Sequence, residues 1–246
     1  MGVGGERPGR GRVLVITGTG TEVGKTVVTA AVAARALADA QRVAVLKPAQ
    51  TGLPAGAPGD AAEAARLAGR LTISELARYP DPLAPATAAA RAGLPPVTPA
   101  EVAKAAEELA DQHDLVLIEG AGGLLVRFDA LGGTLADAAV LLAAPVLVVV
   151  EAGLGTLNLT ALTAEALRAR ALPLAGLVIG RWPATPDLAA RCNLADLPNV
   201  ADAPLLGAIP EGAGALPPET FRTASVHWLA PALGGRLDPT TLTGTP

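Results

Sequence analysis

Several features that mark particular classes of protein are scarce in this sequence of 246 residues. Cys192 is the only cysteine, so no disulfide can form within the chain and nothing favours an oxidising compartment. The longest apolar run, residues 138–150, is interrupted by Pro145 and is shorter than the roughly 20 residues that span a bilayer. The apolar stretch behind the N-terminal arginines covers only residues 13–16, too few for a secretion signal. We therefore expect a cytoplasmic protein that does not enter a membrane.

A surplus of positive charge is also absent. The chain has 19 Lys and Arg against 23 Asp and Glu, which gives a net charge of −4. Proteins that bind nucleic acid or an anionic membrane surface usually carry a basic patch, so neither is an expected partner. Lys25, Lys47 and Lys104 are the only lysines. In so arginine-rich a chain a retained lysine points to chemistry that a guanidinium cannot perform, although nucleotide bias in the gene would also favour arginine.

What is present is an alternation of short apolar runs with longer alanine-rich segments. This pattern is typical of β-α-β units and predicts an α/β fold: a mostly parallel sheet with helices on both faces, as in the three-layer P-loop NTPases. The predicted strands cover residues 13–17, 42–47, 115–119, 145–151, 174–179 and 205–209. The predicted helices cover residues 26–38, 60–67, 98–112, 135–142, 157–170, 185–194 and 221–233.

The length fits a single domain over residues 1–246. No linker rich in Ser or Gly divides the chain. The ends, residues 1–11 and 235–246, are expected to be flexible, and the Pro/Gly-rich stretches 53–59 and 80–99 to be loops.

The first predicted strand runs into a glycine-rich stretch and then a helix. Gly18, Gly20 and Gly24 precede Lys25 and Thr26. In such a phosphate loop the backbone amides and the helix N-terminus surround an anion, the lysine reaches the terminal phosphates, and the threonine hydroxyl binds Mg²⁺. The spacing is one residue longer than in the standard loop. An ordinary glycine-rich turn is the alternative, but the order of strand, Gly-Lys-Thr and helix favours binding of a nucleoside triphosphate.

Charged residues follow two further strands. Glu119 ends an apolar strand and Lys47 ends another. The carboxyl ends of parallel strands meet at one edge of the sheet, where ligands bind, so Glu119 is a candidate Mg²⁺ ligand and Lys47 a candidate for stabilising anionic intermediates. Asp60 opens a helix and is either its N-cap or a magnesium ligand. Glu119 as a strand cap and Lys47 as a surface lysine are the corresponding structural alternatives.

These motifs in combination resemble the dethiobiotin synthetase family, over nearly the whole chain (residues 13–233). The phosphate loop alone occurs in many ATPases, but its combination with Lys-Pro-x-x-Thr-Gly at residues 47–52, Glu-Gly-Ala-Gly-Gly at 119–123 and Leu-Gly-Thr-Leu-Asn at 154–158 is specific. The resemblance implies a ligase of biotin biosynthesis. Such an enzyme joins 7,8-diaminopelargonate and CO₂ into dethiobiotin, through a carbamate and a carbamoyl-phosphate mixed anhydride, while ATP becomes ADP and phosphate with Mg²⁺. It also implies a homodimer.

The resemblance further implies roles for individual residues. Thr26, Asp60 and Glu119 would contact the metal, and Lys25 and Lys47 would be the catalytic residues. The implied substrate contacts are Thr21, Lys47, Thr51, Gly122 and, from a region that meets the neighbouring subunit, Asn158. The implied nucleotide contacts are Glu22, Val23, Gly24, Lys25, Thr26, Val27, Asp60, Glu119, Gly120, Ala121, Gly122, Gly180, Arg181, Pro210, Glu211 and Gly212. An N-cap is the alternative role of Asn158, and Leu159, Leu162 and Leu167 on its helix lie either at the dimer interface or on the sheet.

The sequence departs from the family at Gly180, where members commonly carry an Asn that reads adenine. Because glycine has no side chain to read the base, we hypothesise a relaxed base preference that extends to CTP. Two other functions remain open: a partition-type switch ATPase and a synthetase of the cobyrinate type. The first predicts an extra lysine near Thr17, Gly18 and Thr19, and the second a glutamine-using domain with a catalytic cysteine; the sequence has neither.

Overall fold

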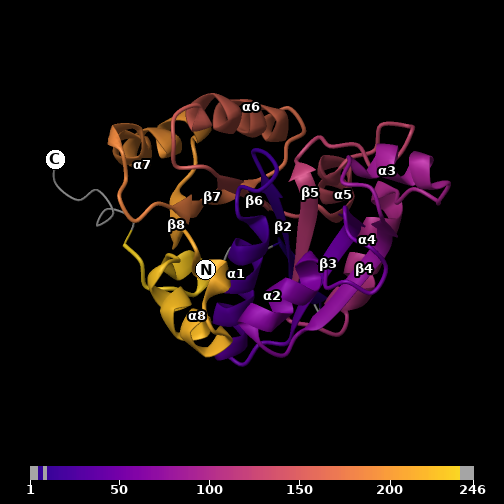
Figure 1. The fold of residues 1–246 in the computed structure, drawn as a ribbon, viewed down its shortest axis with the longest axis horizontal. Coiled ribbons are helices and arrows are strands. Elements are labelled where there is room, and N and C mark those ends of the chain that lie inside the picture. The colour runs from indigo at the N-terminus through magenta and orange to yellow at the C-terminus, as the bar shows by residue number, and fades with distance from the viewer. Residues whose placement is uncertain (1–4, 8–9, 239–246) are drawn as a thin grey trace.

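The computed structural model describes residues 5–7 and 10–238 and has a twisted sheet at its centre (Figure 1). Seven parallel strands follow the order β4-β3-β5-β2-β6-β7-β8, and β1 pairs with β2 in the antiparallel sense. The strands are β1 (Gly5–Arg7), β2 (Arg10–Gly18), β3 (Val43–Thr51), β4 (Thr72–Tyr79), β5 (Leu115–Gly123), β6 (Val146–Val150), β7 (Leu174–Trp182) and β8 (Leu205–Pro210). The strand that carries the phosphate loop, β2, lies between β5 and β6.

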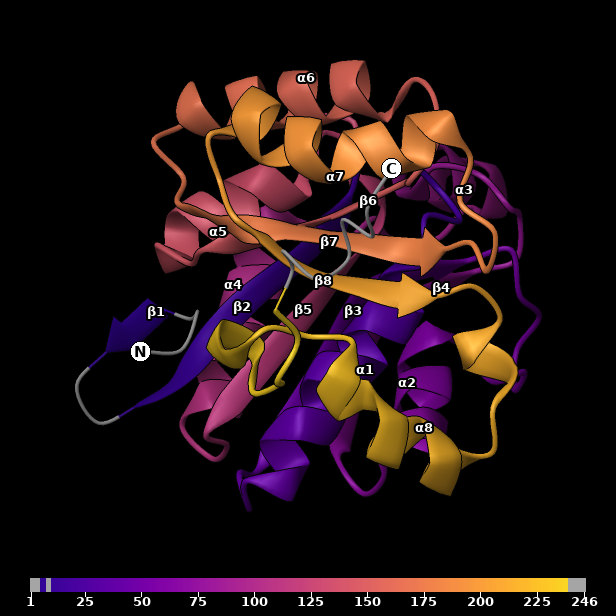
Figure 2. The ribbon, with the colours of Figure 1, turned by 90° about the vertical axis from the view of Figure 1, so that its left-hand side faces the viewer.

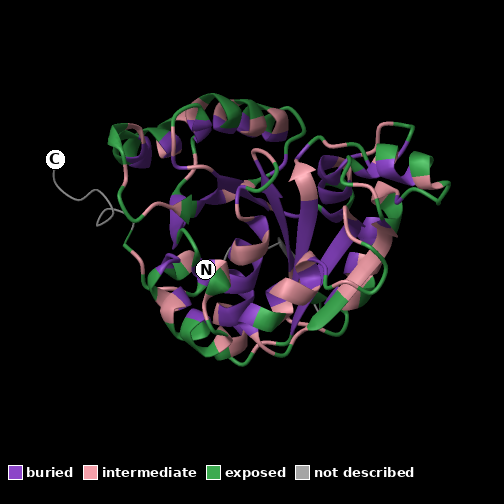
Figure 3. Ribbon diagram, viewed as in Figure 1, coloured by how far each residue is buried: buried purple, intermediate pink, exposed green. Residues whose placement is uncertain are grey.

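Helices cover both faces of the sheet. They are α1 (Lys25–Ala38), α2 (Asp60–Ala68), α3 (Pro85–Ala92), α4 (Pro99–Ala110), α5 (Leu135–Leu142), α6 (Thr156–Arg168), α7 (Leu188–Ala201) and α8 (Pro218–Ala224), with 3-10 turns at Ala213–Ala215, Ser225–His227 and Pro231–Leu233. Figure 2 shows α6 and α7 on one side of the strands, and α1, α2 and α8 on the other. Figure 3 shows the central strands buried between helices whose outer faces are exposed.

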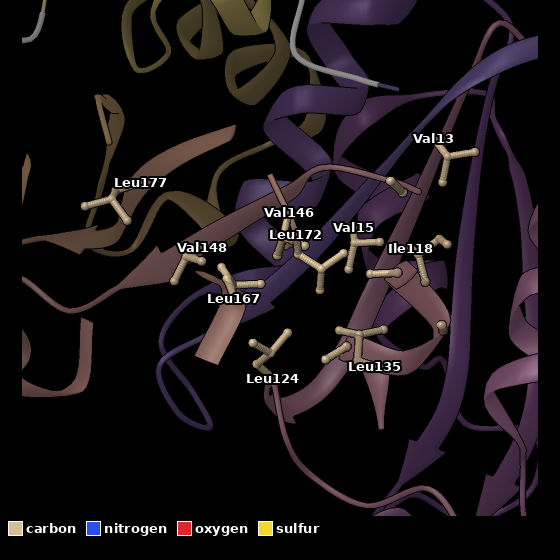
Figure 4. Packing of buried hydrophobic residues seen from close by; sticks show 14 of the residues in the cluster. Val13, Val15, Ile118, Leu124, Leu135, Val146, Val148, Leu167, Leu172 and Leu177 are labelled. Atoms are coloured by element: carbon tan, nitrogen blue, oxygen red, sulfur yellow. The ribbon is translucent and has the colours of Figure 1, made fainter. Parts of the chain in front are cut away.

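The core has two halves because successive side chains of a strand point to opposite faces. Val13 and Val15 of β2 pack with α4, α5, α6 and α7 on one face, part of which Figure 4 shows. Leu14 and Ile16 pack with α1, α2 and α8 on the other face. The continuous apolar run that predicted the strand thus serves both halves of the core, as expected for a strand covered on both faces.

The predicted strands are all present, but the structure also contains elements that the sequence did not predict. The edge strand β4 was missed, and α3 lies within residues 80–99, which were predicted to be a loop. The helix predicted over 221–233 is wrong: α8 ends at Ala224 and two 3-10 turns follow, the second beginning at Pro231. Proline has no amide hydrogen and disfavours helix in the residue before it, so a continuous helix cannot pass this point unstrained.

Parts of the expected flexible ends are ordered. β1 and the first residues of β2 are strand, and the amides of Gly235, Arg236 and Leu237 donate hydrogen bonds to backbone carbonyls of the C-terminal turns. Residues 1–4, 8–9 and 239–246 lie outside the described residues. Among the residues the structure describes, no helix is long and apolar enough to cross a membrane.

Candidate active site

The loop between β2 and α1 presents backbone amides at the carboxyl edge of the sheet. Glu22 and Gly24 adopt left-handed conformations, with φ of 61° and 96°. A Cβ on Gly24 would lie 2.5 Å from the Gly180 carbonyl oxygen, so only glycine fits there. No side chain caps the start of α1. The first amides of this helix and its positive dipole end are therefore available to an anion.

Lys25 is the first residue of α1, and its ammonium group folds over the loop. Nζ donates a hydrogen bond to the Gly20 carbonyl at 2.8 Å. Burial, and secondly the positive charge of Lys47, lower the pKa of Lys25 below the usual lysine value. One carbonyl partner does not offset the cost of removing an ammonium group from water, so an anionic ligand beside Lys25 would be stabilising.

Lys47 brings together the residues predicted at three separate places in the sequence. Its Nζ lies 3.0 Å from Glu119 Oε1, 2.5 Å from Asp60 Oδ2 and 3.1 Å from the Gly120 carbonyl oxygen. The Lys47 side chain is 2% exposed. Burial lowers the pKa of Lys47, but the charges of Glu119 and Asp60 and their hydrogen bonds outweigh it and raise the pKa above the usual value. The ammonium therefore stays charged inside the protein.

Glu119 joins this cluster to the phosphate loop because β5 and β2 are neighbours, with Ile16 and Glu119 in register. Its Oε1 accepts a hydrogen bond from Thr26 Oγ1 at 2.8 Å. Its Oε2 is buried without a hydrogen-bond partner. A buried carboxylate oxygen without a partner is costly, and a cation beside it would remove that cost.

These oxygens fit Mg²⁺. The described residues contain no cluster of three or more His, Cys, Asp or Glu that could hold a metal by themselves. Mg²⁺ does not need one, because it is usually held by one or two carboxylates together with substrate phosphates and water. Thr26, Glu119 and Asp60, next to a phosphate-binding loop, offer oxygen donors of the kind that such a site uses.

The cluster opens into a cavity of about 780 Å³. Most of the predicted site residues line it: Thr21, Glu22, Gly24, Lys25, Thr26, Val27, Lys47, Thr51, Asp60, Glu119, Ala121 and Gly122. Two predicted contacts are close by, since Val23 is buried within the phosphate loop and the Gly120 carbonyl accepts from Lys47. The structure thus brings the predicted phosphate and metal residues and, apart from Asn158, the predicted substrate residues to one place.

The remaining predicted nucleotide contacts lie outside this cavity. Gly180, Arg181, Pro210, Glu211 and Gly212 are not in its lining. Gly180 nevertheless adjoins the phosphate loop, because a Cβ on it would lie 2.0 Å from the Val23 carbonyl oxygen. The Glu211 amide joins the 210–212 segment to β7 by donating to the Trp182 carbonyl at 2.8 Å. The absence of a side chain at 180 therefore has a structural cause, since no larger residue fits without moving the phosphate loop.

Asn158 is not in the cavity either. It lies exposed on α6, beside the exposed Leu159 and close to the exposed Leu162. Leu167 is fully buried and packs on the sheet, so of the two positions considered for this leucine the sheet is the correct one.

Some lining residues were missed. They are Ala49, Gln50, Gly52, Leu53, Pro82, Leu83, Ala84, Pro85 and Val126. Gln50 lies inside the Lys47–Thr51 motif and could have been considered, since a polar residue within a buried strand is unusual. The residues at 82–85 precede α3, and Pro85 at the first position of that helix was the available signal.

Solved structures define the class to which this fold belongs. The cell division ATPase MinD of Pyrococcus furiosus has a TM-score of 0.56 at 19% identity, covering 87% of this chain and 97% of that one. A ParA family ATPase from Chlorobium tepidum has a TM-score of 0.57 at 13% identity, covering 92% and 97%. At these identities the likeness concerns the fold alone. It confirms the predicted class, a three-layer α/β protein of the P-loop NTPase type.

Closer relatives identify the family within that class. The model of the AAA domain family matches residues 12–218. The ATP-dependent dethiobiotin synthetase BioD of Streptomyces coelicolor is 71% identical over 92% of this chain and 95% of its own length. The protein of the same name from Saccharopolyspora erythraea is 70% identical over 91% and 98%. The chain belongs to the ATP-dependent dethiobiotin synthetase family, which confirms the resemblance seen in the motifs.

Proposed function

We propose that this protein is a ligase of biotin biosynthesis that makes dethiobiotin from 7,8-diaminopelargonate, CO₂ and ATP. The observation that carries the proposal is the cavity in which two buried lysines, two carboxylates and a phosphate loop converge. Anions form at two successive steps of this reaction and must be stabilised by the site, whereas no protein nucleophile is needed. This site offers positive charge and oriented amides, which suit that task.

The chemistry begins with one amine of the substrate, which adds to CO₂ and loses a proton to give a carbamate. A carbamate oxygen then attacks the γ-phosphorus of ATP; the bond to ADP breaks, and a carbamoyl-phosphate anhydride forms. The second amine attacks the carbamoyl carbon, phosphate leaves with the electron pair of the C–O bond, and a proton is released as the cyclic urea closes. Lys25 and Lys47 stabilise the carbamate and the transferred phosphoryl group, while Thr21, Thr51 and the Gly122 backbone contact the diamine.

The metal in this proposal is Mg²⁺, held by Thr26, Asp60 and Glu119. When bound, it offsets the negative charge of the phosphates during transfer. The support for the assignment is the partnerless Oε2 of Glu119, on the carboxylate whose other oxygen already accepts from Thr26.

The nucleotide preference in this proposal is relaxed and includes CTP as well as ATP. Family members commonly read adenine with an asparagine where this chain has Gly180, and the tight packing of Gly180 on Val23 leaves no room for one. Backbone groups near Arg181 and at 210–212 then face the base and discriminate less sharply than a side-chain amide.

The active form in this proposal is a cytoplasmic homodimer in which α6 of one copy lies near the cavity of the other. Leu159 and Leu162 are exposed apolar side chains on α6, next to Asn158. Burying them in a symmetric interface would remove apolar surface from water.

The test is to measure phosphate release from MgATP, and dethiobiotin by mass spectrometry, with and without 7,8-diaminopelargonate and bicarbonate. We expect release to depend on the diamine and to match dethiobiotin formation. Lys47→Gln, which keeps a hydrogen-bond donor but removes the charge, should lower kcat about 100- to 1,000-fold, the usual loss for one electrostatic contact to a transition state.

The matched control is Lys104→Gln, at a lysine on α4 that is 80% exposed and does not line the cavity. It should leave both rates unchanged. Phosphate release that does not depend on the diamine would contradict the proposed function and favour the partition-type switch ATPase considered in the sequence analysis. Full activity of Lys47→Gln would contradict only the role assigned to Lys47 and would leave the proposed function standing.

A further inference from the structure

Gln50 is a buried glutamine near the end of β3 whose side chain holds the beginning of α2. Its Oε1 accepts a hydrogen bond from the Asp60 amide at 2.8 Å, and its Nε2 donates to the Thr51 carbonyl at 3.2 Å. Gly59, the residue before α2, provides no side-chain cap. The first amides of a helix have no partner within the helix. Gln50 therefore supplies, from another element, the acceptor that Ser, Thr or Asp usually supplies as an N-cap.

The backbone of Gly59 fits tightly against this glutamine and an ion pair of β4. A Cβ on Gly59 would lie 2.7 Å from Gln50 Oε1, 2.9 Å from Arg78 Nη2 and 3.0 Å from Glu75 Oε2. Arg78 donates to both carboxylate oxygens of Glu75, at 2.7 and 2.9 Å. Its Nη1 also donates to two carbonyls of the 53–59 loop, at 3.1 and 2.7 Å. The approach of the chain to Asp60 is thus held by bonds from two strands.

Asp60 needs such support because its own ion pair does not fix it. Its carboxylate contacts the Lys47 ammonium, yet the Asp60 side chain is 38% exposed whereas that of Lys47 is 2% exposed. Ion pairs with a partner this open to water are weak and do not hold a flexible side chain in one geometry. The position of the Asp60 carboxylate therefore depends on where the first turn of α2 lies.

We propose that Gln50 is a positioning residue for the metal: by holding the Asp60 amide, it keeps the Asp60 carboxylate at the corner formed by Lys47 and Glu119. The inference rests on the proposed function, which assigns Asp60 to Mg²⁺. Residues that orient a ligand without touching the metal typically change metal affinity about 10- to 100-fold when they are replaced.

The experiment measures Mn²⁺ binding to the protein–ADP complex by electron paramagnetic resonance, so that no turnover is needed. Mn²⁺ suits the same oxygen ligands as Mg²⁺. Gln50→Met keeps the length of the side chain but removes the acceptor, and we expect it to raise the Kd for Mn²⁺ about 10-fold. ADP affinity in EDTA should not change, because the phosphate loop is untouched. Gln112→Met, at an exposed glutamine after α4, is the matched control and should leave the Mn²⁺ Kd unchanged.

A double-mutant cycle with Asp60→Asn separates the outcomes. If Gln50 acts through Asp60, Gln50→Met should add little in the Asp60→Asn background. The same 10-fold loss in both backgrounds, or no loss in either, would overturn the positioning role. If Asp60→Asn itself leaves the Mn²⁺ Kd unchanged, the assignment of Asp60 to the metal fails and the inference falls with it.

A second variant guards against poor folding of Gln50→Met. Gly59→Ala keeps a glutamine at position 50, but its methyl group would lie 2.7 Å from Gln50 Oε1 and displace that atom from the Asp60 amide. It should raise the Mn²⁺ Kd in the same direction, again only when Asp60 is present. Unchanged Mn²⁺ affinity in a folded Gly59→Ala protein would contradict the proposal.

Discussion

Lys47 and Lys25 are both buried in one cavity, yet their surroundings shift their pKa values in opposite directions. Lys47 has two carboxylates beside it, and these outweigh the cost of burial. Lys25 has a backbone carbonyl as its hydrogen-bond partner, and burial dominates. The contrast means that the two ammonium groups do not respond to pH or to ligands alike, although both are expected to stabilise anions in the same reaction.

Lysine titration provides a prediction at this scale. With only three lysines in the chain, spectra of ¹³C-lysine-labelled protein are simple to assign. Lys25 should titrate at a lower pH than Lys47, and Lys47→Gln should move the Lys25 pKa upward because a repelling charge is removed. The stability that Lys47 contributes should be fully present below the lysine pKa of the unfolded chain, about 10.4, and be lost as pH rises through its higher folded value. A Lys25 pKa that stays in place in Lys47→Gln would show that the two charges do not interact.

Individual residues also differ in how far the sequence predicts them. Lys25, Thr26 and Glu119 follow strands in recognisable motifs, so the motifs alone were enough to predict that they converge. Gln50 and Arg78 were not predicted, because the fold brings each of them next to a segment that is distant in sequence. Gln50 holds the start of α2. Arg78 lies on β4 and donates to carbonyls of residues 53–59. No local pattern records such a contact.

At the scale of elements, the same limit separates central strands from edge strands. The central strands are continuously apolar because helices cover both faces, and that pattern was sufficient to predict them. β4 lies at the edge of the sheet, and its residues are mostly exposed or half-buried, with Glu75 and Arg78 among them. α3 was hidden within a Pro-rich stretch, where Pro85 begins the helix rather than preventing it. An element that is buried on one face, or on neither, has a weaker hydrophobic pattern in the sequence than a strand covered on both faces.

The contact between β7 and the phosphate loop leads to a prediction about nucleotides. Because no side chain at 180 faces the base, initial rates with CTP and ATP should lie within about 10-fold of each other, the effect of a hydrogen bond of about 1.4 kcal/mol. Gly180→Ala should reduce kcat/KM for both nucleotides alike, since its Cβ would press on the Val23 carbonyl of a loop that both use. Gly153→Ala, where a Cβ would meet nothing within 4 Å, is the control for a glycine substitution. Activity with ATP and none with any other triphosphate would rule out the relaxed preference.

At the scale of the whole molecule, exposed leucines distinguish α6 from most of the surface. Leu154, Leu159 and Leu162 lie close together in sequence at the start of this helix and just before it, and all are exposed. Single exposed leucines are ordinary, but a group of them next to Asn158, a predicted substrate contact, favours an interface. Asn158 belongs to the same surface and is outside the cavity of its own chain, so a role in substrate binding requires a second copy.

The last prediction therefore concerns assembly. Two leucines of nearly equal exposure can be compared: Leu162 on α6 is 54% exposed, and Leu141 on α5 is 55% exposed. If α6 forms a symmetric interface, Leu162→Glu acts twice, and loss of about 1.5–3 kcal/mol per buried leucine weakens the dimer by at least about 100-fold. Leu141→Glu should leave it intact. Sedimentation velocity measures the association, and steady-state assays should show Leu162→Glu losing kcat/KM for the diamine because Asn158 no longer reaches the neighbouring cavity. A wild-type protein that is monomeric and fully active would contradict both the dimer and the shared site. A Leu162→Glu variant that is monomeric but fully active would be consistent with the dimer and would contradict the role of Asn158 in the site.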